Sequence, residues 1–247
     1  MRKLKNITLV AVATKEVEAT LAALRYSCRE IQFERVLLMA PFHPEPAARD
    51  VEFVPIAPFA DVGEWGRFVV FKLHEYISTD HIMLVHADGF IVHPEQWQEA
   101  FRSYDYIGAP WPLPRDLFSY RDHLGNIIRV GNSVSLRSRR LLQLPSELNL
   151  PWTAEHGFFH EDGFLCVQYR HFLERQGVRF APLQLACHFS RENPIPENRS
   201  LRPFAFHKWK GPNRLYPCFG KRPSLLRKFT GILRKWCQHG GSGKLRS

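Results

Sequence analysis

Several motifs that mark common nucleotide-dependent and hydrolytic enzymes are missing from this sequence of 247 residues. It has neither a P-loop nor a G-x-G-x-x-G segment, which argues against an NTPase and against a dinucleotide enzyme. It also lacks G-x-S-x-G, so a serine-hydrolase elbow is not supported. Its five cysteines include no C-x-x-C pair, and a disulfide framework or a cysteine zinc site is therefore not expected.

Long apolar runs are missing too. No stretch approaches the roughly 18 uninterrupted apolar residues of a membrane-spanning helix. The N-terminal MRKLKNITLVAVAT has a basic start and a short apolar run, but Lys15 and Glu16 follow at once without a cleavage region. We therefore expect a cytoplasmic protein.

Acidic residues are absent from the last part of the chain. Residues 221–247 contain eight of the 34 basic residues and none of the 24 acidic ones, so the rest of the chain is nearly neutral. Residues 1–220 lack the excess of basic residues that a nucleic-acid-binding domain carries, and no RRM, KH or zinc-finger pattern is present. On a helix, residues 225–236 would gather their apolar side chains on an arc of about 120° opposite the basic ones. Such a helix lies on an anionic membrane or packs on the domain; the missing acids favour the membrane.

The pattern of apolar residues predicts an α/β fold. In the first half, apolar runs rich in β-branched residues predict buried strands at 7–13, 35–40, 51–56 and 81–86. Helices are expected between them at 15–30 and 65–78. This alternation implies right-handed crossovers and a mainly parallel sheet. In the second half we expect helices at 94–103, 138–144 and 161–176, strands at 127–137 and 178–181, and loops at 107–114 and after 181.

Asp88 follows the strand at 81–86 directly, in HADGF. Ligands bind at the carboxyl edge of open parallel sheets, where a carboxylate can hold Mg²⁺ or Mn²⁺ against a diphosphate. A turn-forming Asp-Gly is an equally simple explanation. The two-carboxylate form Asp-x-Asp is absent, because positions 86 and 90 are His86 and Phe90.

Two further segments carry polar groups suited to chemistry. Glu161 and Asp162 lie among phenylalanines at the start of a predicted helix. One acid there satisfies the helix dipole, and the other is free to act as a general base; we choose Asp162, with Glu161 as the alternative. Gly131, Asn132 and Ser133 form either a turn or a place where backbone approaches a ligand. His156 and His160 have zinc-ligand spacing with Glu161, but the H-E-x-x-H order is missing.

Five segments occur in an order that resembles the DUF5672 type, a GT-A-like glycosyltransferase group of bacteria and fungi. They are HIMLVHADGFIVHPE, YDYIGAPW, VGNSVSLRSRRLL, HEDGFLC and FAFH, and together with the preceding helix they cover roughly residues 65–207. The resemblance implies a nucleotide-diphospho-sugar transferase fold, with a mainly parallel sheet flanked by helices. It also implies a catalytic domain at 1–215, followed by a basic amphipathic tail at 216–247.

The resemblance also implies roles for single residues. Asp88 would bind the metal and the donor diphosphate, with His207 as second metal ligand, and Asp162 would be the base of an inverting enzyme. Donor binding would involve residues near Asp88 and in the GNS segment, with Trp111 packing on a sugar ring. The expected donor-binding set is Asp88, Gly89, Thr14, Lys72, Trp111, Gly131, Asn132 and Ser133.

The sequence thus predicts a hexosyltransferase-like enzyme that uses a nucleotide-sugar and Mn²⁺ or Mg²⁺. Its acceptor would be a glycan or a lipid-linked glycan in bacterial surface polysaccharide synthesis, with the tail on the inner face of the membrane. Three alternatives stay open: a metal-dependent hydrolase or nucleotidyltransferase, a catalytically inactive sugar-nucleotide binder, and a nucleic-acid-binding protein.

Overall fold

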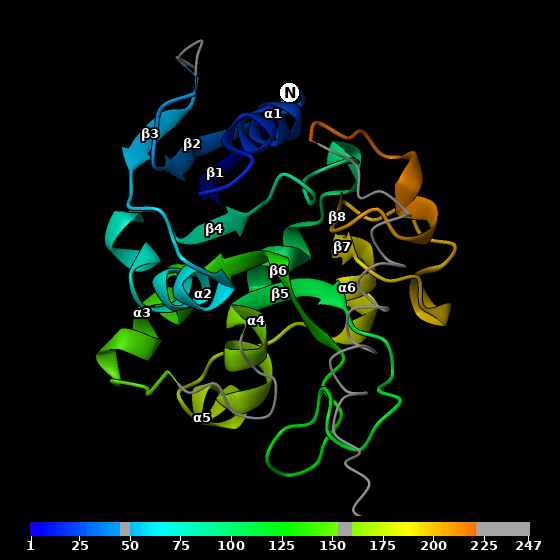
Figure 1. The fold of residues 1–247 in the computed structure, drawn as a ribbon. Helices are drawn as coiled ribbons and strands as arrows, with labels where there is room; N and C mark the ends of the chain where they lie inside the picture. The colour runs from blue at the N-terminus through cyan, green and yellow to red at the C-terminus, as the bar shows by residue number, and fades with distance from the viewer. Residues whose placement is uncertain (45–49, 153–159, 221–247) are drawn as a thin grey trace, which may run out of the picture.

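A six-stranded sheet runs through the molecule (Figure 1). The computed structural model describes residues 1–44, 50–152 and 160–220. The strands of the sheet follow the order β3-β2-β1-β4-β6-β5. Their bounds are β1 Arg2–Val12, β2 Ile31–Ala40, β3 Glu52–Pro55, β4 His81–Leu84, β5 Tyr106–Pro110 and β6 Val130–Ser138.

The sheet is mainly parallel, as the sequence predicted. β1 pairs in parallel with both β2 and β4, and β2 pairs in parallel with β3. Only β6 runs the other way, because it is antiparallel to β4 and to β5. The carboxyl ends of β1 and β4 therefore open onto the same edge of the sheet, which is where ligands bind in open α/β folds.

Helices cover both faces of the central strands. Leu9 of β1 packs in one core cluster with Leu24 of α1, whereas the next residue, Val10, packs in another with Val69 of α2. This alternation explains why the second half of β1, residues 7–12, is almost entirely apolar, since both of its faces are buried there. The helices are α1 Val17–Ser27, α2 Val62–Phe71, α3 Arg139–Glu147, α4 Glu161–Gly163, α5 Arg170–Arg175 and α6 Leu183–Phe189.

The second half departs from the predicted elements at several places. The expected loop at 107–114 begins as strand β5, and the expected strand at 178–181 forms only one bridge, between Phe180 and Tyr106. The expected loop after 181 contains α6 and, further on, a two-stranded sheet of β7 Ser190–Arg191 and β8 Ala205–Phe206.

Two of the predicted helices are also irregular. Residues 94–103 form two short 3₁₀-helices, Pro94–Gln96 and Glu99–Ser103. The helix expected at 161–176 is interrupted by a π-helix at Phe164–Gln168, which separates α4 from α5. π-Bulges of this kind are common beside functional sites.

The first residues of the expected tail pack against the domain. The Phe219 ring lies 5.5 Å from the Tyr26 ring and 5.2 Å from the Phe90 ring, measured between centroids. The basic amphipathic stretch at 221–247 lies outside the described residues. Within the described ranges, no helix has the length and apolar character needed to cross a bilayer.

Candidate active site

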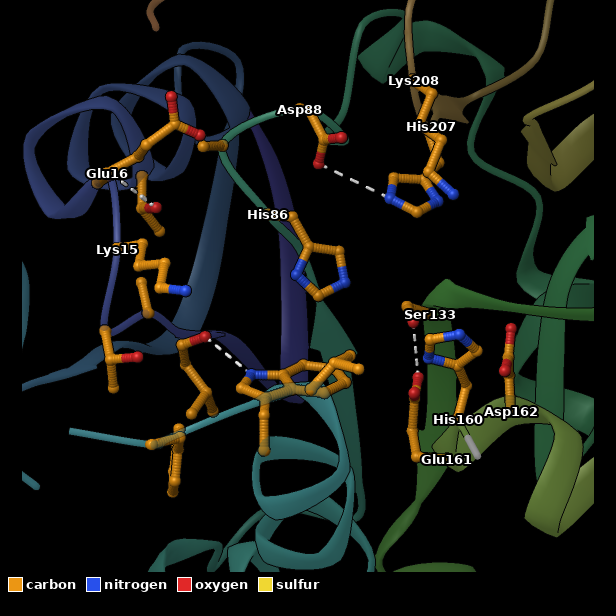
Figure 2. Close-up of a pocket in the computed structure, with 18 of the residues that line it drawn as sticks. Lys15, Glu16, His86, Asp88, Ser133, His160, Glu161, Asp162, His207 and Lys208 are labelled. Carbon is orange, nitrogen blue, oxygen red and sulfur yellow. Dashed lines mark hydrogen bonds and ion pairs between the residues drawn. The ribbon is translucent and has the colours of Figure 1, made fainter. Parts of the chain in front are cut away.

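A cavity of about 420 Å³ opens where β1 and β4 end. It is lined by the segment after β1, the start of α2, the turn after β4, and residues of β6, α4 and the segment after β8. Figure 2 shows Asp88 and His207 on one side of it, and Glu161 and Asp162 on another. The sheet edge expected to hold the site thus carries a polar cavity.

Asp88 and His207 meet although they are far apart in the sequence. Asp88 lies in a tight turn in which the His86 N–H donates to the Gly89 carbonyl over 2.7 Å. The Lys208 N–H donates to the Asp88 carbonyl over 2.7 Å, which fixes the strand-like segment after β8 against this turn. The His207 Nε2 atom then lies 3.5 Å from Asp88 Oδ1.

Gly89 makes this contact sterically possible. A Cβ atom at position 89 would lie 2.6 Å from Val134 Cγ2 and 2.8 Å from His207 Cδ2. No side chain fits at those distances, so the close approach of Asp88 to His207 requires glycine here. Gly89 itself does not line the cavity, and its observed role is to let the two segments pack.

The surroundings of Asp88 favour its charged form. Burial alone would raise its pKa, but the hydrogen bond with His207 and the nearby His86 and Lys208 side chains together hold that pKa well below its usual value. His86 is half-buried at the cavity wall, between the rings of Trp65 and His207, whose centroids lie 5.5 and 5.4 Å from its own. Burial and the neighbouring His207 lower the pKa of His86 to about 4, so His86 is neutral at pH 7.

Glu161 is engaged in a buried ion pair. Its Oε1 atom lies 3.0 Å from Arg137 Nη2 and accepts a hydrogen bond from Ser133 Oγ over 2.6 Å. Burial raises the pKa of Glu161, but Arg137 and the Ser133 hydroxyl outweigh it and lower that pKa overall. A carboxylate held ionised by a fixed arginine is a poor proton acceptor, which leaves the adjacent Asp162 as the better candidate base.

Asp162 has the electrostatic properties of a general base. Its carboxylate lines the cavity and accepts a hydrogen bond from the Gly163 N–H over 2.8 Å. Burial and the negative charge of Glu161 raise the pKa of Asp162 to about 7. A base with a pKa near the working pH transfers protons most effectively.

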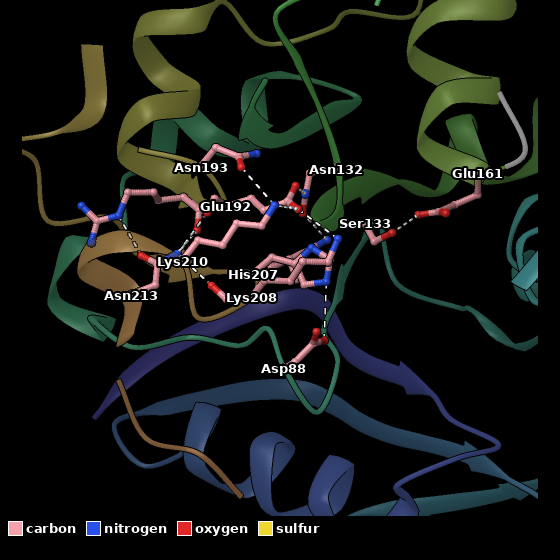
Figure 3. A network of polar contacts seen from close by, with 12 residues as sticks. Asp88, Asn132, Ser133, Glu161, Glu192, Asn193, His207, Lys208, Lys210 and Asn213 are labelled. Carbon is pink, nitrogen blue, oxygen red and sulfur yellow. Dashed lines mark hydrogen bonds and ion pairs between the residues drawn. The ribbon is translucent and has the colours of Figure 1, made fainter. Parts of the chain in front are cut away.

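A second polar network borders the cavity (Figure 3). Glu192 is buried and accepts hydrogen bonds from Lys208 Nζ over 2.9 Å and from the Asn132 side-chain amide. Asn132 adopts a left-handed φ of 83°, and its carbonyl accepts from the Tyr106 hydroxyl. Sequence reasoning missed Glu192 and Lys208. The position of Lys208 directly after His207 was an available signal, whereas nothing local marks Glu192.

The other residues predicted to bind a donor divide into two groups. Thr14, Asn132 and Ser133 line the cavity. The cavity lining does not include Trp111, Gly131 or Lys72. The first two are buried elsewhere in the domain, whereas Lys72 is exposed at the surface.

Trp111 and Gly131 pack against each other and are not part of the cavity lining. A Cβ on Gly131 would lie 2.1 Å from the Trp111 ring, and that ring also stacks on Tyr120 at 4.8 Å. Trp111 is only 5% exposed, so it has no free face for a sugar ring. Lys72 instead points to solvent at the end of α2, where it pairs with Glu75 over 2.9 Å.

Few side chains of the cavity are placed to act as ligands of a metal ion. The described residues contain no group of three or more His, Cys, Asp or Glu side chains arranged to hold a metal ion. Asp88 and His207 offer one oxygen and one nitrogen donor, and the buried His207 Nδ1 atom has no hydrogen-bond partner. Such a pair fits Mg²⁺ or Mn²⁺, which commonly take one or two protein ligands and complete their shell with phosphates and water. For the alternative zinc site, His156 lies outside the described residues, and the Glu161 carboxylate already forms an ion pair with Arg137.

The fold is that of GT-A glycosyltransferases. The chain aligns with the solved structure of an active-site mutant of LgtC at a TM-score of 0.51 and 10% identity, covering 92% of this chain and 95% of LgtC. A glycosyltransferase involved in the glycosylation of the major capsid of PBCV-1 aligns at a TM-score of 0.47 and 10% identity. The alignment covers 84% of this chain and 95% of that one. The bifunctional IspDF from Campylobacter jejuni aligns at a TM-score of 0.44 and 11% identity. The alignment covers 71% of this chain and 48% of IspDF. At 10% identity, the likeness to LgtC establishes the fold alone.

No curated protein matches the sequence. A protein-family profile does match, over residues 50–207, and this range contains Asp88, Glu161, Asp162 and His207. The match covers more than half of the chain and agrees with the resemblance carried by its five motifs. The chain therefore belongs to the DUF5672 family, described as proteins of unknown function.

Proposed function

We propose that this protein is a glycosyltransferase that moves a sugar from a nucleotide-sugar donor to a hydroxyl group of an acceptor. One observation carries the proposal. Asp88 and His207 lie on one side of a cavity in a GT-A fold, and the Asp162 carboxylate, with a pKa of about 7, lines another side of the same cavity. This arrangement supports diphosphate binding and proton removal within one site.

The donor diphosphate would bind beside Asp88. The side chains of Lys15 and Lys208 also line the cavity and supply positive charge for phosphate oxygens. Glu192 accepts from Lys208 Nζ and from Lys210 Nζ, over 2.9 and 3.3 Å, and so fixes where these charges point. Thr14 and Asn132 border the same space and offer polar groups to the nucleotide or the sugar.

Asp88 and His207 would hold a divalent metal ion, with Asp88 kept ionised by its neighbours. When bound, Mn²⁺ or Mg²⁺ would neutralise charge that builds on the leaving nucleoside diphosphate. The remaining positions around such an ion would be open to the donor, because no third His, Cys, Asp or Glu side chain of the described residues is grouped with this pair as a metal ligand.

Asp162 would accept the proton from the acceptor hydroxyl. The freed oxygen then bonds to the anomeric carbon as the carbon–oxygen bond to the diphosphate breaks, and the nucleoside diphosphate leaves with that electron pair. Attack from the face opposite the leaving group inverts the anomeric configuration. Glu161 is poorly placed to be a second nucleophile, because Arg137 and Ser133 hold its Oε1 atom and its Oε2 atom is buried, and this supports a single inverting displacement.

The acceptor would be a glycan or a lipid-linked glycan, in the synthesis of a bacterial surface polysaccharide. The basic amphipathic residues 221–247 support contact with an anionic membrane where such acceptors are held. Deleting these residues should release the protein from membranes and leave transfer to a soluble acceptor intact. Unchanged membrane association would refute the tether.

The first test is a thermal-shift screen against UDP, GDP, CMP and their sugars, with and without Mn²⁺. A ligand at a hundredfold excess over its Kd stabilises the fold by about 2.7 kcal/mol. We expect a metal-dependent rise in Tm with one nucleotide family, lost in Asp88→Ala and kept in Lys72→Ala, whose side chain lies outside the cavity. A shift followed by donor hydrolysis or nucleotide transfer, without sugar transfer, would favour the hydrolase or nucleotidyltransferase instead.

Stereochemistry tests the mechanism separately. NMR of the product formed with the identified donor reports its anomeric configuration. A product with the opposite configuration to the donor supports Asp162 as the base of a single displacement. Retention of the donor's configuration would rule this mechanism out, while leaving the transferase activity itself intact.

A further inference from the structure

Tyr120 belongs to the long connection between β5 and β6, which forms the green loops at the lower edge of Figure 1. Its φ is 55°, a left-handed backbone conformation in which a bulky side chain is rarely found. Such conformations are strained, persist only where the surrounding structure holds them, and gather at functional sites. The backbone therefore singles out Tyr120 as a candidate functional residue.

Contacts on both sides of Tyr120 fix its position. The Ile128 N–H donates to the Tyr120 carbonyl over 2.6 Å. Two residues after Tyr120, the Asp122 carboxylate contacts His171 Nε2 of α5 at 2.7 Å. The connection is thereby tied to the segment that returns to β6 and also to α5, so the Tyr120 side chain is presented from a defined place.

The Tyr120 ring is the outer layer of a stack that begins at β6. The innermost layer is the backbone of Gly131, where a Cβ atom would lie 2.1 Å from the Trp111 ring. Trp111 is the middle layer, and the Tyr120 ring stacks on it with 4.8 Å between centroids and 23° between planes. Trp111 has no free face, whereas Tyr120 is partly exposed and keeps the face that is turned away from Trp111. The C–H face of a sugar ring packs on an aromatic face of this kind.

The stack lies beside the cavity, on the side of the candidate base. Gly131, at its inner end, is followed directly by the two residues of β6 that line the cavity. Burial raises the pKa of Tyr120, and the negative charges of Glu192 and Asp162 raise it further, so the phenol lies within reach of both carboxylates. Tyr120 does not line the cavity itself. A molecule on its ring would therefore lie at the rim near Asp162 and leave the interior to the donor.

We propose that Tyr120 is the platform on which the acceptor binds, and that the part of the acceptor carrying the reacting hydroxyl is a sugar ring. The inference rests on the proposed transferase function and narrows its acceptor to a carbohydrate. One face of the sugar packs on the Tyr120 ring, and one of its hydroxyl groups reaches Asp162, which takes the proton in the displacement described above. A lipid alcohol or a serine side chain has no comparable face to place on the ring.

Saturation-transfer NMR of the full chain tests the platform directly. The probes are the methyl glycosides of glucose, galactose, mannose and N-acetylglucosamine, each as both anomers. We expect saturation of at least one of them, strongest on the protons of one ring face. Tyr120→Ala should abolish it and Tyr120→Trp should keep it. Phe118→Ala is the matched control, since Phe118 is 76% exposed in the same connection, and it should leave saturation unchanged. No saturation of any glycoside, or equal saturation in Tyr120→Ala, would overturn the proposal.

Kinetics separate this role from a structural one. With the donor found by the thermal-shift screen and the saturated glycoside as acceptor, Tyr120→Ala should raise the acceptor KM by roughly fivefold to tenfold, the loss of one aromatic contact. The donor KM should not change, and Tyr120→Phe, which keeps the ring, should retain the acceptor KM. A parallel rise in both KM values, or loss of the nucleotide-dependent rise in Tm in Tyr120→Ala, would show that Tyr120 only supports the cavity and would overturn the platform.

The two proposals fail in different ways. If no nucleotide stabilises the wild type, the transferase function fails, while saturation that depends on Tyr120 still identifies a carbohydrate site. If nucleotides bind and sugar transfer is observed while Tyr120→Ala behaves as the wild type, the function stands and the platform is wrong.

Discussion

Arg137 and Glu161 form an ion pair that is entirely withdrawn from solvent, with 3.0 Å between Nη2 and Oε1. The pair joins β6 to the first residue of α4, directly beside Asp162. Arg137 is further fixed by a hydrogen bond from its Nε atom to Ser135 Oγ and by the Tyr106 ring, 5.3 Å away. The negative charge of Glu161 is therefore held in place next to the candidate base, where it raises the pKa of Asp162.

Removing the arginine should be costly to the fold. Arg137→Met leaves Glu161 as a buried charge without its partner, which typically lowers the free energy of unfolding by about 3–5 kcal/mol. Urea denaturation measures this loss. Arg137→Met combined with Glu161→Leu removes both charges and should recover most of the stability. Similar losses in the single and the double variant would show that the pair matters through packing and not through charge.

Replacing Glu161 should shift the pH dependence of transfer. Asp162 must be deprotonated to act, so activity should rise as the pH passes through its pKa of about 7. Glu161→Gln removes the neighbouring negative charge, and the Gln oxygen can still accept from Arg137 and Ser133. The pKa of Asp162 should fall, and the acidic limb of kcat/KM against pH should move to lower pH. Thr14→Val is the control, since it changes the cavity away from Asp162. An unmoved acidic limb would remove Asp162 from the role of base.

Asp162 should also make stability depend on pH. Its pKa is raised from 3.8 to about 7 by folding, so the folded state binds the extra proton between these values. The stability gained by protonation is complete below the unfolded pKa and is lost as the pH rises through about 7. Asp162→Asn should therefore be more stable than the wild type at pH 8, and nearly equal to it at pH 4, by chemical denaturation. The same variant should lose transfer activity. A wild-type advantage at pH 8 would contradict the raised pKa.

The central part of the fold could be predicted from the sequence because its signals are local. The C-terminal parts of β1, β2 and β4 are apolar on both faces, and the helices between these strands carry regular apolar spacing. β5 was missed because its evidence is not local. Its Gly108 lets the Gly131 carbonyl of β6 approach so closely that a Cβ would lie 1.9 Å away. Two prolines and a tryptophan at 110–112 suggested a loop, whereas pairing with β6, whose partner residues are 20 to 31 positions away in the sequence, decided the outcome.

The site was predictable to the extent that it depends on residue type and strand order. Asp88 follows a buried strand and Asp162 lies in the first turn of a helix among apolar residues, and both line the cavity. The ion pair of Glu161 with Arg137 was not foreseeable, because nothing in the strand pattern shows that Arg137 points into the core. Trp111 was assigned to a sugar for its chemistry alone, and its burial against Gly131 and Tyr120 follows from tertiary packing.

Gly89 provides a test of the contact between Asp88 and His207. In Gly89→Ala the added methyl group meets Val134 and His207 at less than 3 Å. The turn must shift, and overpacking of this kind costs about 1–3 kcal/mol of stability. Because the shift moves Asp88 away from His207, the metal-dependent rise in Tm with nucleotide should disappear even where the variant remains folded.

Gly125→Ala is the matched control for that variant. Its φ of 82° makes alanine strained there, but nothing lies within 4 Å of the added atom, so it destabilises the chain without touching the cavity. The two variants should lose comparable stability, yet only Gly89→Ala should lose the nucleotide response. If both retain it, the spacing between Asp88 and His207 is not needed for donor binding. If both lose it, the response follows overall stability and says nothing specific about the turn.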